Sequence, residues 1–299
     1  MAGPGVGGSP GAGARARWQR LDRPPLDAAA LRAALTPPSG PFARVDVARE
    51  VASTNADVVA AAAGPDWPGW PDLSVLTAEH QRAGRGRLDR GWTTPPHAAL
   101  TTSVLLRPGV PVARWSWIPL LAGVTLTETL RTVAGVQAEL KWPNDVLATE
   151  PDGDDVARKV AGVLTEVVPT PDGSAVVVGT GLNVSQRRGE LPGPAATSLL
   201  LAGARTLDRD TLLRATLRAL AAGYREWVDA GGDAVACGLA ARVRETCSTI
   251  GAGVRIELPG GADLTGVADG VDDEGRLLVD TGSRVTAVAA GDVVHVRRA

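Results

Sequence analysis

The sequence predicts an α+β protein that carries a small all-β module at its C-terminus. Between residues 27 and 250, strand-like and helix-like apolar patterns alternate without an internal repeat. After Gly251, Ala252 and Gly253 the pattern changes to short strands separated by tight Gly/Asp turns. With 299 residues and 44% apolar composition, the chain is long enough to bury one large core and to form a small second domain.

The first half of the chain is expected to alternate helices and strands. A first helix over residues 27–35 should end before Pro37 and Pro38. Thr54 and Asp57 are spaced as a capping box, so a second helix should start there and end at Gly64. The other elements expected in this half are strands over residues 42–51, 73–78, 98–106 and 136–140 and a long helix over residues 115–133.

The second half begins with two buried strands, at residues 160–168 and 175–184, which should form a hairpin. Asp208 then caps an amphipathic helix with an apolar stripe of Leu213, Leu217, Leu220, Tyr224 and Val228. A further helix is expected over residues 234–247. The C-terminal module should contain strands at residues 254–258, 264–268, 276–280, 283–288 and 292–296.

Bulk properties exclude several classes of protein. The net charge of −2 gives no global field that favours nucleic acid or an anionic membrane. Apolar runs end well short of the roughly 20 residues that a membrane span needs. Cys237 and Cys247 supply neither a disulfide framework nor metal-ligand spacing. Residues 1–22 lack the apolar stretch of a secretory signal, so we expect a disordered tail on a cytoplasmic protein.

The chain has only two lysines, Lys141 and Lys159, against 29 arginines (31 basic residues minus two). Lysine is a compact, strongly hydrated point charge, whereas arginine is a wide planar fork. A lysine kept where arginine has taken almost every other cationic position suggests a deep site for a small anion, such as a carboxylate or a phosphate oxygen. Codon bias that spared two lysines by chance is the alternative.

The segment QRAGRGRLDRGW at residues 81–92, named here the Gly/Arg segment, is a second candidate anion site. It carries Arg82, Arg85, Arg87 and Arg90 against a single aspartate. Gly84 and Gly86 allow a tight turn whose N–H groups could face phosphate oxygens. The segment matches neither the P-loop nor the GxGxxG pattern, and a solvated basic turn is the alternative. Nucleic-acid binding is disfavoured because the C-terminal module is neither basic nor aromatic.

From about residue 40 to its end, the chain resembles the biotin–protein ligases. The motifs, in the family's order, are Ser53-Thr54-Asn55, Gln81 with GRGRxxRxW at 84–92, KWPND at 141–145, RKxAGxLxE at 158–166 and GTGLNV at 179–184. The resemblance implies a catalytic domain over residues 23–250, with a mixed sheet related to class II aminoacyl-tRNA synthetases. It also implies an SH3-like barrel over residues 251–299, closed by GDVVHVR. The winged helix of the repressor-type members is missing, so we expect a ligase that does not bind DNA.

The resemblance implies roles for individual residues. The expected catalytic residues are Lys159, which would hold the biotin carboxylate, and Arg85 and Arg87, which would clamp the phosphate. The expected biotin-binding residues are Ser53, Thr54, Asn55, Gln81, Gly84, Arg85, Gly86, Arg87, Lys159 and Gly162. The expected ATP-binding residues are Arg85, Arg87, Arg90, Trp92, Lys141, Asn144, Asp145, Lys159 and Asn183, with a weaker carry-over to Arg297. Metal ligands remain unassigned, and Trp92 and Trp142 could equally fill the core.

The implied activity is a two-step ligation. ATP and Mg²⁺ (or Mn²⁺) would activate biotin to biotinyl-5′-AMP, and a lysine on the biotin carboxyl carrier domain of a carboxylase would then accept the biotin. The enzyme would be a monomer or a weak homodimer without membrane contact. The alternative is a lipoate or octanoate ligase of the same fold. An octanoyltransferase is disfavoured because it needs a catalytic cysteine, whereas Cys237 and Cys247 lie far from every motif.

Overall fold

The computed structural model describes residues 23–87, 90–151, 153–258, 262–289 and 292–295. Its centre is a mixed seven-stranded sheet of order β1-β2-β5-β9-β8-β7-β6. The first pair is parallel and all other neighbours are antiparallel. The strands are β1 (Arg44–Ala48), β2 (Ser74–Ala78), β5 (Ala99–Leu106), β6 (Ala138–Lys141), β7 (Asp145–Ala148), β8 (Arg158–Thr170) and β9 (Gly173–Asn183). The predicted α+β class and the β8–β9 hairpin are confirmed.

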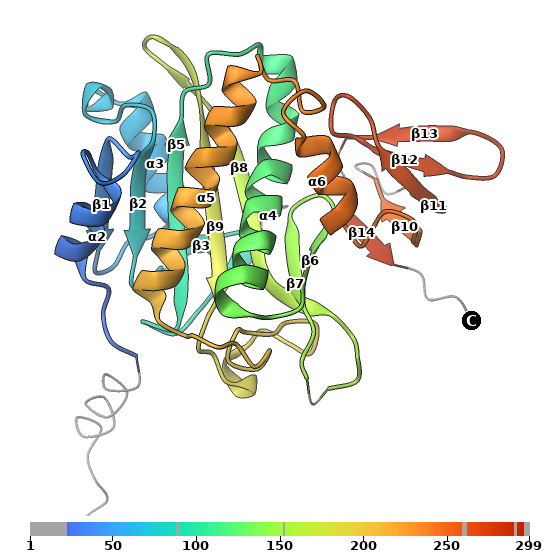
Figure 1. Ribbon diagram of the computed structural model, residues 1–299, viewed down its shortest axis with the longest axis horizontal. Helices are drawn as coiled ribbons and strands as arrows, with labels where there is room; N and C mark the ends of the chain where they lie inside the picture. The colour runs from blue at the N-terminus through green and yellow to red at the C-terminus, as the bar shows by residue number, and fades with distance from the viewer. Residues whose placement is uncertain (1–22, 88–89, 152, 259–261, 290–291, 296–299) are drawn as a thin grey trace, which may run out of the picture.

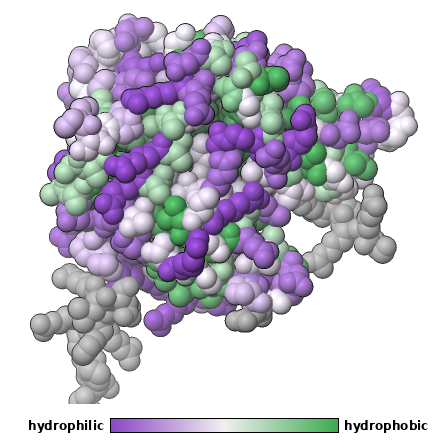
Figure 2. Space-filling model, in the orientation of Figure 1, coloured by the Kyte–Doolittle hydropathy of each residue, from purple (hydrophilic) through white to green (hydrophobic). Residues whose placement is uncertain are grey.

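Helices α4 (Ile118–Thr129) and α5 (Arg209–Asp229) lie side by side on one face of the sheet, with α6 (Leu239–Thr246) next to α4 (Figure 1). Helix α2 (Ala28–Leu35) packs against β1 and α5. The predicted stripe of α5 is buried from Leu213 to Tyr224, while hydrophilic side chains occur over the outward surface of these helices (Figure 2). The main core therefore lies between the helices and the sheet. Among the described helices, none has both the length and the apolar character to cross a membrane.

The opposite face of the sheet carries α3 (Thr54–Ala63), which contacts β2, β5, β8 and β9. A second apolar cluster fills the space beneath this helix, and it includes Val58, Leu105 and Val177. Beside the helix, the Gly/Arg segment folds back on itself as a short ribbon of β3 (Gly84–Arg85) and β4 (Gly91–Trp92). This face is thus only partly covered, and it leaves room for a site.

The C-terminal module is a five-stranded antiparallel sheet in the order β13-β12-β11-β10-β14. Its strands are β10 (Gly253–Glu257), β11 (Asp263–Val271), β12 (Leu277–Asp280), β13 (Val285–Val288) and β14 (Asp292–His295). Within the described residues the order is linear, and no pairing joins its two edge strands. The Trp117 indole donates to the Asp273 carbonyl over 2.8 Å, and the Trp142 indole donates to the Gly275 carbonyl over 3.3 Å. These contacts dock the module on the main domain.

Three helix boundaries differ from those predicted. The cap of α3 is Ser53, whose hydroxyl accepts from the Ala56 N–H, so the capping box at Thr54 was placed one residue late. The long helix over 115–133 begins as a 3₁₀ turn, becomes α-helical at Ile118 and ends in a π turn. The helix over 234–247 starts only at Leu239, because Gly238 has a φ of 77° that no α-helix accommodates.

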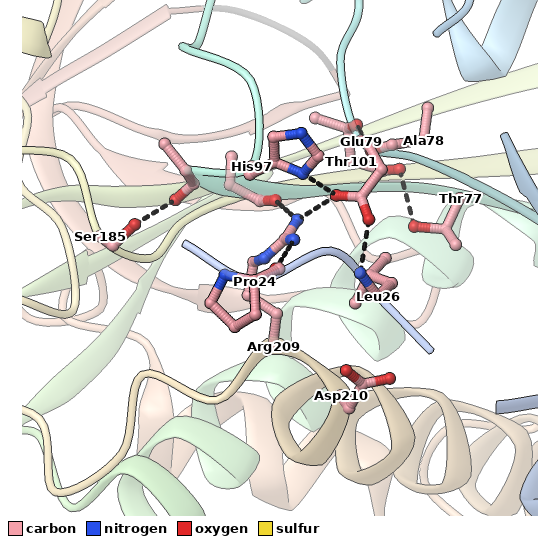
Figure 3. A network of polar contacts seen from close by, with 12 residues as sticks. Pro24, Leu26, Thr77, Ala78, Glu79, His97, Thr101, Ser185, Arg209 and Asp210 are labelled. Carbon is pink, nitrogen blue, oxygen red and sulfur yellow. Dashed lines mark hydrogen bonds and ion pairs between the residues drawn. The ribbon is translucent and has the colours of Figure 1, made fainter. Parts of the chain in front are cut away.

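A buried ion pair ties the first described residues to the sheet (Figure 3). The Arg209 side chain, at the start of α5, donates to Glu79 Oε2 over 2.6 Å and to the Pro24 carbonyl over 2.6 Å. Glu79 also accepts from the Leu26 N–H, and His97 Nδ1 lies 3.0 Å from Glu79 Oε2. Both members of the pair are buried. Because Glu79 directly follows β2, this network fixes the strand end from which the Gly/Arg segment departs.

Candidate active site

Small residues form the floor of a cavity where β8 and β9 pair. Successive side chains on a strand point to opposite faces, and Gly162, Gly179 and Gly181 all lie on the face that carries α3. In the register of the two strands, Gly162 is opposite Gly181, and Leu164 is opposite Gly179. These glycines line a cavity of about 200 Å³ between the sheet, the start of α3 and the Gly/Arg segment.

Most of the predicted site residues line this one cavity. They come from α3, the Gly/Arg segment, the start of β7 and β8, which are far apart in the sequence. The predicted residues that line it are Ser53, Thr54, Asn55, Gln81, Arg85, Gly86, Arg87, Arg90, Trp92, Asn144, Asp145, Lys159 and Gly162.

The indole ring of Trp92 lies directly on the glycine floor. A Cβ atom placed on Gly181 would be 2.4 Å from Cε2 of the Trp92 ring, and one on Gly162 would be 3.6 Å from its Cζ3. Lys159 Nζ lies 5.7 Å from the centre of the same ring. The indole N–H is buried and has no hydrogen-bond partner among the described residues. Trp92 therefore forms a wall of the cavity, whereas Trp142 packs at the junction with the C-terminal module.

Substitution of Gly181 by alanine should displace Trp92, because Cβ contacts as short as 2.4 Å do not occur in folded proteins. We expect the KM for the ligand of this cavity to rise by about tenfold to a hundredfold, since small displacements of positioning groups are costly. Gly270→Ala is the matched control, because a Cβ on this strand glycine meets no atom within 4 Å. Equal KM values for both variants would show that the Trp92 position does not matter.

The cations of the cavity are held by specific partners. Lys159 Nζ lies 2.6 Å from Asp145 Oδ1. Arg87 donates to the side-chain oxygen of Asn144 over 3.0 Å. Burial lowers the pKa of the Arg87 guanidinium, against the attraction of Asp145, but arginine stays charged in proteins. The cavity therefore concentrates positive charge in a partly buried place, where electrostatic interactions are stronger than in water.

A row of polar side chains runs along the other end of the cavity. Gln81 Oε1 accepts from the N–H of Thr54 and lies 3.0 Å from its hydroxyl. The Ser103 hydroxyl lies 2.8 Å from the Thr54 hydroxyl and 2.6 Å from Asn55 Oδ1. Two hydroxyl protons serve these three oxygen–oxygen contacts, so one contact lacks a proton. This end of the cavity therefore offers oxygen acceptors to a ligand that donates N–H groups.

Three predicted residues do not line the cavity. Gly84 lies in β3, where a Cβ would be 2.3 Å from the Trp92 carbonyl oxygen. Asn183 is buried and is held by the Thr197 carbonyl and the Gln186 amide. Lys141 lies next to the cavity on β6. Burial lowers its pKa, against the attraction of the Asp145 carboxylate, and the nearby Lys159 and Arg90 lower it further. Arg297 lies outside the described residues.

Sequence reasoning assigned no role to several residues of the site. These are Gly91, Val163, Leu164, Gly179, Thr180, Gly181 and Pro192, which line the cavity, and Ser103 and Glu166, which bind its polar side chains. Alternation along a strand was the available signal for Leu164 and Glu166, because both lie on the same face of β8 as Gly162. Ser103 carried no such signal, since its contacts depend on the packing of α3 against β5.

Comparisons with known proteins point to related ligases along most of the chain. The Biotin/lipoate A/B protein ligase family matches residues 53–183, and the Biotin protein ligase C terminal domain matches residues 249–296. The Biotin--[acetyl-CoA-carboxylase] ligase of Mycobacterium tuberculosis is 43% identical over 92% of this chain and 97% of its own length. The bifunctional ligase/repressor BirA of Bacillus subtilis is 30% identical over 75% of this chain, which spans 66% of that protein.

A solved structure agrees with these sequence matches. The Aquifex aeolicus biotin protein ligase in complex with biotin and ATP superimposes with a TM-score of 0.67 and 26% identity, over 86% of this chain and all of that one. The mixed sheet, its helices and the C-terminal antiparallel sheet are thus those of a biotin or lipoate protein ligase. Within that class, the chain belongs to the biotin protein ligase family.

Proposed function

We propose that this protein activates biotin with ATP to biotinyl-5′-AMP and transfers the biotin to a lysine of a carrier domain. The observation that carries the proposal is the cavity itself. A polar row that offers oxygen acceptors lies at one end, and Lys159, Arg85, Arg87 and Arg90 are gathered around the rest. Biotin has matching ends: a neutral ureido ring with two N–H donors and a tail that ends in a carboxylate.

The polar row would bind the ureido ring. One of the contacts among the oxygens of Gln81, Thr54, Asn55 and Ser103 lacks a proton, so an N–H group of the ring would complete the hydrogen bonds of this row. Ser53 would contribute its hydroxyl, which also caps α3. The Trp92 ring, which rests on the glycine floor, would then form a flat apolar wall against the aliphatic part of the ligand.

The cations would bring the two anionic reactants together in the first step. A biotin carboxylate oxygen attacks the α-phosphorus of ATP, the bond between that phosphorus and the α,β-bridging oxygen breaks, and pyrophosphate leaves. Lys159 would hold the carboxylate, while Arg85 and Arg87 would stabilise the charge on the phosphate oxygens. Charges fixed in advance in a partly buried cavity need little reorganisation during the reaction. Lys141, beside the cavity, would add to the positive potential.

Mg²⁺ would enter this site with the nucleotide. The described residues contain no group of three metal-binding side chains. Asp145 nevertheless places one carboxylate on the cavity wall next to the Asn144 amide. That donor set fits Mg²⁺, which binds through one or two carboxylates plus phosphates and water. When bound, the ion would neutralise charge on the phosphates.

In the second step, the neutral ε-amine of a carrier lysine attacks the acyl carbon of the mixed anhydride. The bond to the phosphate oxygen breaks, AMP leaves, and the attacking nitrogen releases one proton to the solvent, which gives the amide. The nucleophile belongs to the partner, a biotin carboxyl carrier domain, so the ligase needs none of its own. We also propose that the main domain is related to class II synthetases and that the C-terminal sheet closes as an SH3-like barrel. A cytoplasmic location is proposed as well, and the two free cysteines agree with it.

We further propose that the protein is a monomer or at most a weak homodimer. The two edges of the large sheet are β1 and β6. Arg32 donates to the Val45 carbonyl on β1, and Arg131 donates to the Ala138 carbonyl on β6. A side chain that occupies an edge carbonyl hinders the pairing of that edge with a second chain.

ATP–pyrophosphate exchange tests the proposed function. The purified protein, with Mg²⁺, should catalyse exchange when biotin is added and should not do so with lipoate or octanoate. The polar row is the physical reason, because neither lipoate nor octanoate has N–H donors to complete its hydrogen bonds. Exchange with lipoate or octanoate alone would keep the fold and overturn the substrate. No exchange with any of the three acids would overturn the activity.

A further inference from the structure

Glu166 lies at the outer end of the cavity floor and contacts both of its walls. It follows Gly162 and Leu164 on the same face of β8. Arg85 Nη2 donates to both carboxylate oxygens of Glu166, over 3.1 Å and 2.9 Å. From the other side, Asn55 Nδ2 donates to Glu166 Oε2 over 2.8 Å. One carboxylate therefore joins the Gly/Arg segment to the start of α3.

The two partners of Glu166 differ in how firmly other contacts already fix them. Asn55 is buried and already fixed, because its amide also donates to the Leu164 carbonyl and its oxygen accepts from Ser103. Arg85 is different: its side chain is 45% exposed, and it belongs to a ribbon with two paired residues on each strand. Glu166 therefore restricts the position of the Arg85 side chain far more than that of Asn55.

The surroundings of the ribbon strengthen this contrast. Besides the main cavity, a second hollow of about 400 Å³ is lined by the ribbon and by Leu164 and Glu166 of β8. Space, rather than packed side chains, therefore adjoins the ribbon there. The Arg85–Glu166 pair is a direct side-chain link between the ribbon and β8 across this region. A second link, from Arg87 to Asn144, reaches the start of β7.

We infer that Glu166 is a positioning residue that acts through Arg85. It holds the β3–β4 ribbon beside the cavity, so that a bound adenylate is retained until the carrier lysine arrives. The inference rests on the proposed function, since it concerns the retention of that intermediate. Glu166 itself would not touch the reacting atoms, which the cations and Asp145 surround.

The test measures how fast the adenylate leaves. Enzyme is loaded with labelled biotin, ATP, Mg²⁺ and pyrophosphatase, freed of excess ligand, diluted, and sampled by rapid filtration. Glu166→Gln keeps an oxygen that can accept from Asn55 but removes the charge that holds Arg85. We expect the dissociation rate to rise about three- to fivefold, the effect of losing one partly exposed ion pair. The maximal rate of pyrophosphate exchange should fall by no more than this factor, because Arg85 keeps its charge and loses only the partner that positions it.

The matched control is Glu128→Gln. Glu128 binds Arg242 through both carboxylate oxygens, with comparable exposure, on α4 and α6 far from the cavity. This variant should release the adenylate at the wild-type rate. A second test places Glu166→Gln in an Arg85→Gln background. If Glu166 acts through Arg85, adding Glu166→Gln to Arg85→Gln should not raise the dissociation rate of the adenylate any further.

Three results would contradict the inference. One is a dissociation rate of Glu166→Gln equal to that of the control. Another is a full effect of Glu166→Gln in the Arg85→Gln background, which would mean that the carboxylate acts through Asn55. The third is a wild type that forms no adenylate at all, which would overturn the proposed function and this inference with it. If the wild type and both variants form adenylate, equal dissociation rates for Glu166→Gln and Glu128→Gln would overturn the inference alone.

Discussion

Replacement of Lys159 by alanine is expected to reduce adenylate synthesis by about a hundred- to a thousandfold, the usual effect of removing one preorganised charge or donor at a reacting centre. Its Nζ lies 2.6 Å from Asp145 and 5.7 Å from the centre of the Trp92 ring, on the wall of the cavity. Without this ammonium, the carboxylate of Asp145 would face the carboxylate of the incoming biotin. The loss should appear in single-turnover formation of biotinyl-5′-AMP.

Lys159→Arg should not restore this activity. A Cβ on Gly162 would already be 3.1 Å from the Lys159 Nζ, so the wider guanidinium fork would press on the floor of the cavity. Arg276→Ala is the control for loss of a cation, because Arg276 is similarly exposed and pairs with Asp272 in the C-terminal module. Adenylate synthesis by Lys159→Ala within about tenfold of this control would remove Lys159 from the mechanism.

The resemblance to the biotin–protein ligases was sufficient to predict which segments line the cavity, because the family's motifs occur in this chain in the same order. It was not sufficient to predict their contacts. The position of Trp92 depends on the register that sets Gly162 opposite Gly181, and a shift of one residue would turn both glycines away. Arg85 and Glu166 are 81 positions apart, and nothing local connects them. Tertiary pairing alone determines such contacts.

For the fold, the sequence likewise predicted the elements better than their exact ends and pairing. Strands were predicted well in the C-terminal module, because tight turns separate them. Closure of that module into a barrel would require its edge strands β13 and β14 to pair. Residues 296–299, which follow β14, lie outside the described part of the chain. Helix ends were predicted less well, because Ser53 and Thr54 are both good caps and only the backbone geometry selects the first. Asn183 likewise lies in a site motif, yet its amide is used to hold a neighbouring loop.

Arg209→Met is expected to lower the free energy of unfolding by about 3–5 kcal/mol, the cost of leaving one member of a buried ion pair without its partner. Arg209 and Glu79 have side-chain exposures of 5% and 6%. After the substitution, the Glu79 carboxylate would stay buried, and among the described residues only His97 and the Leu26 N–H would compensate its charge (Figure 3). Denaturant unfolding at neutral pH measures the change.

The matched control for this prediction is Arg242→Met, which removes the partly exposed pair with Glu128 and should cost no more than about 1 kcal/mol. Adding Glu79→Gln to Arg209→Met should recover part of the stability, because it removes the unpaired charge. If the loss for Arg209→Met were no larger than that of the control, water would have to reach Glu79. The described packing of the N-terminal residues against β2 would then be wrong. A large loss, partly recovered in the double variant, would show that burial of the charge is what ties these residues to the strand end that leads into the active site.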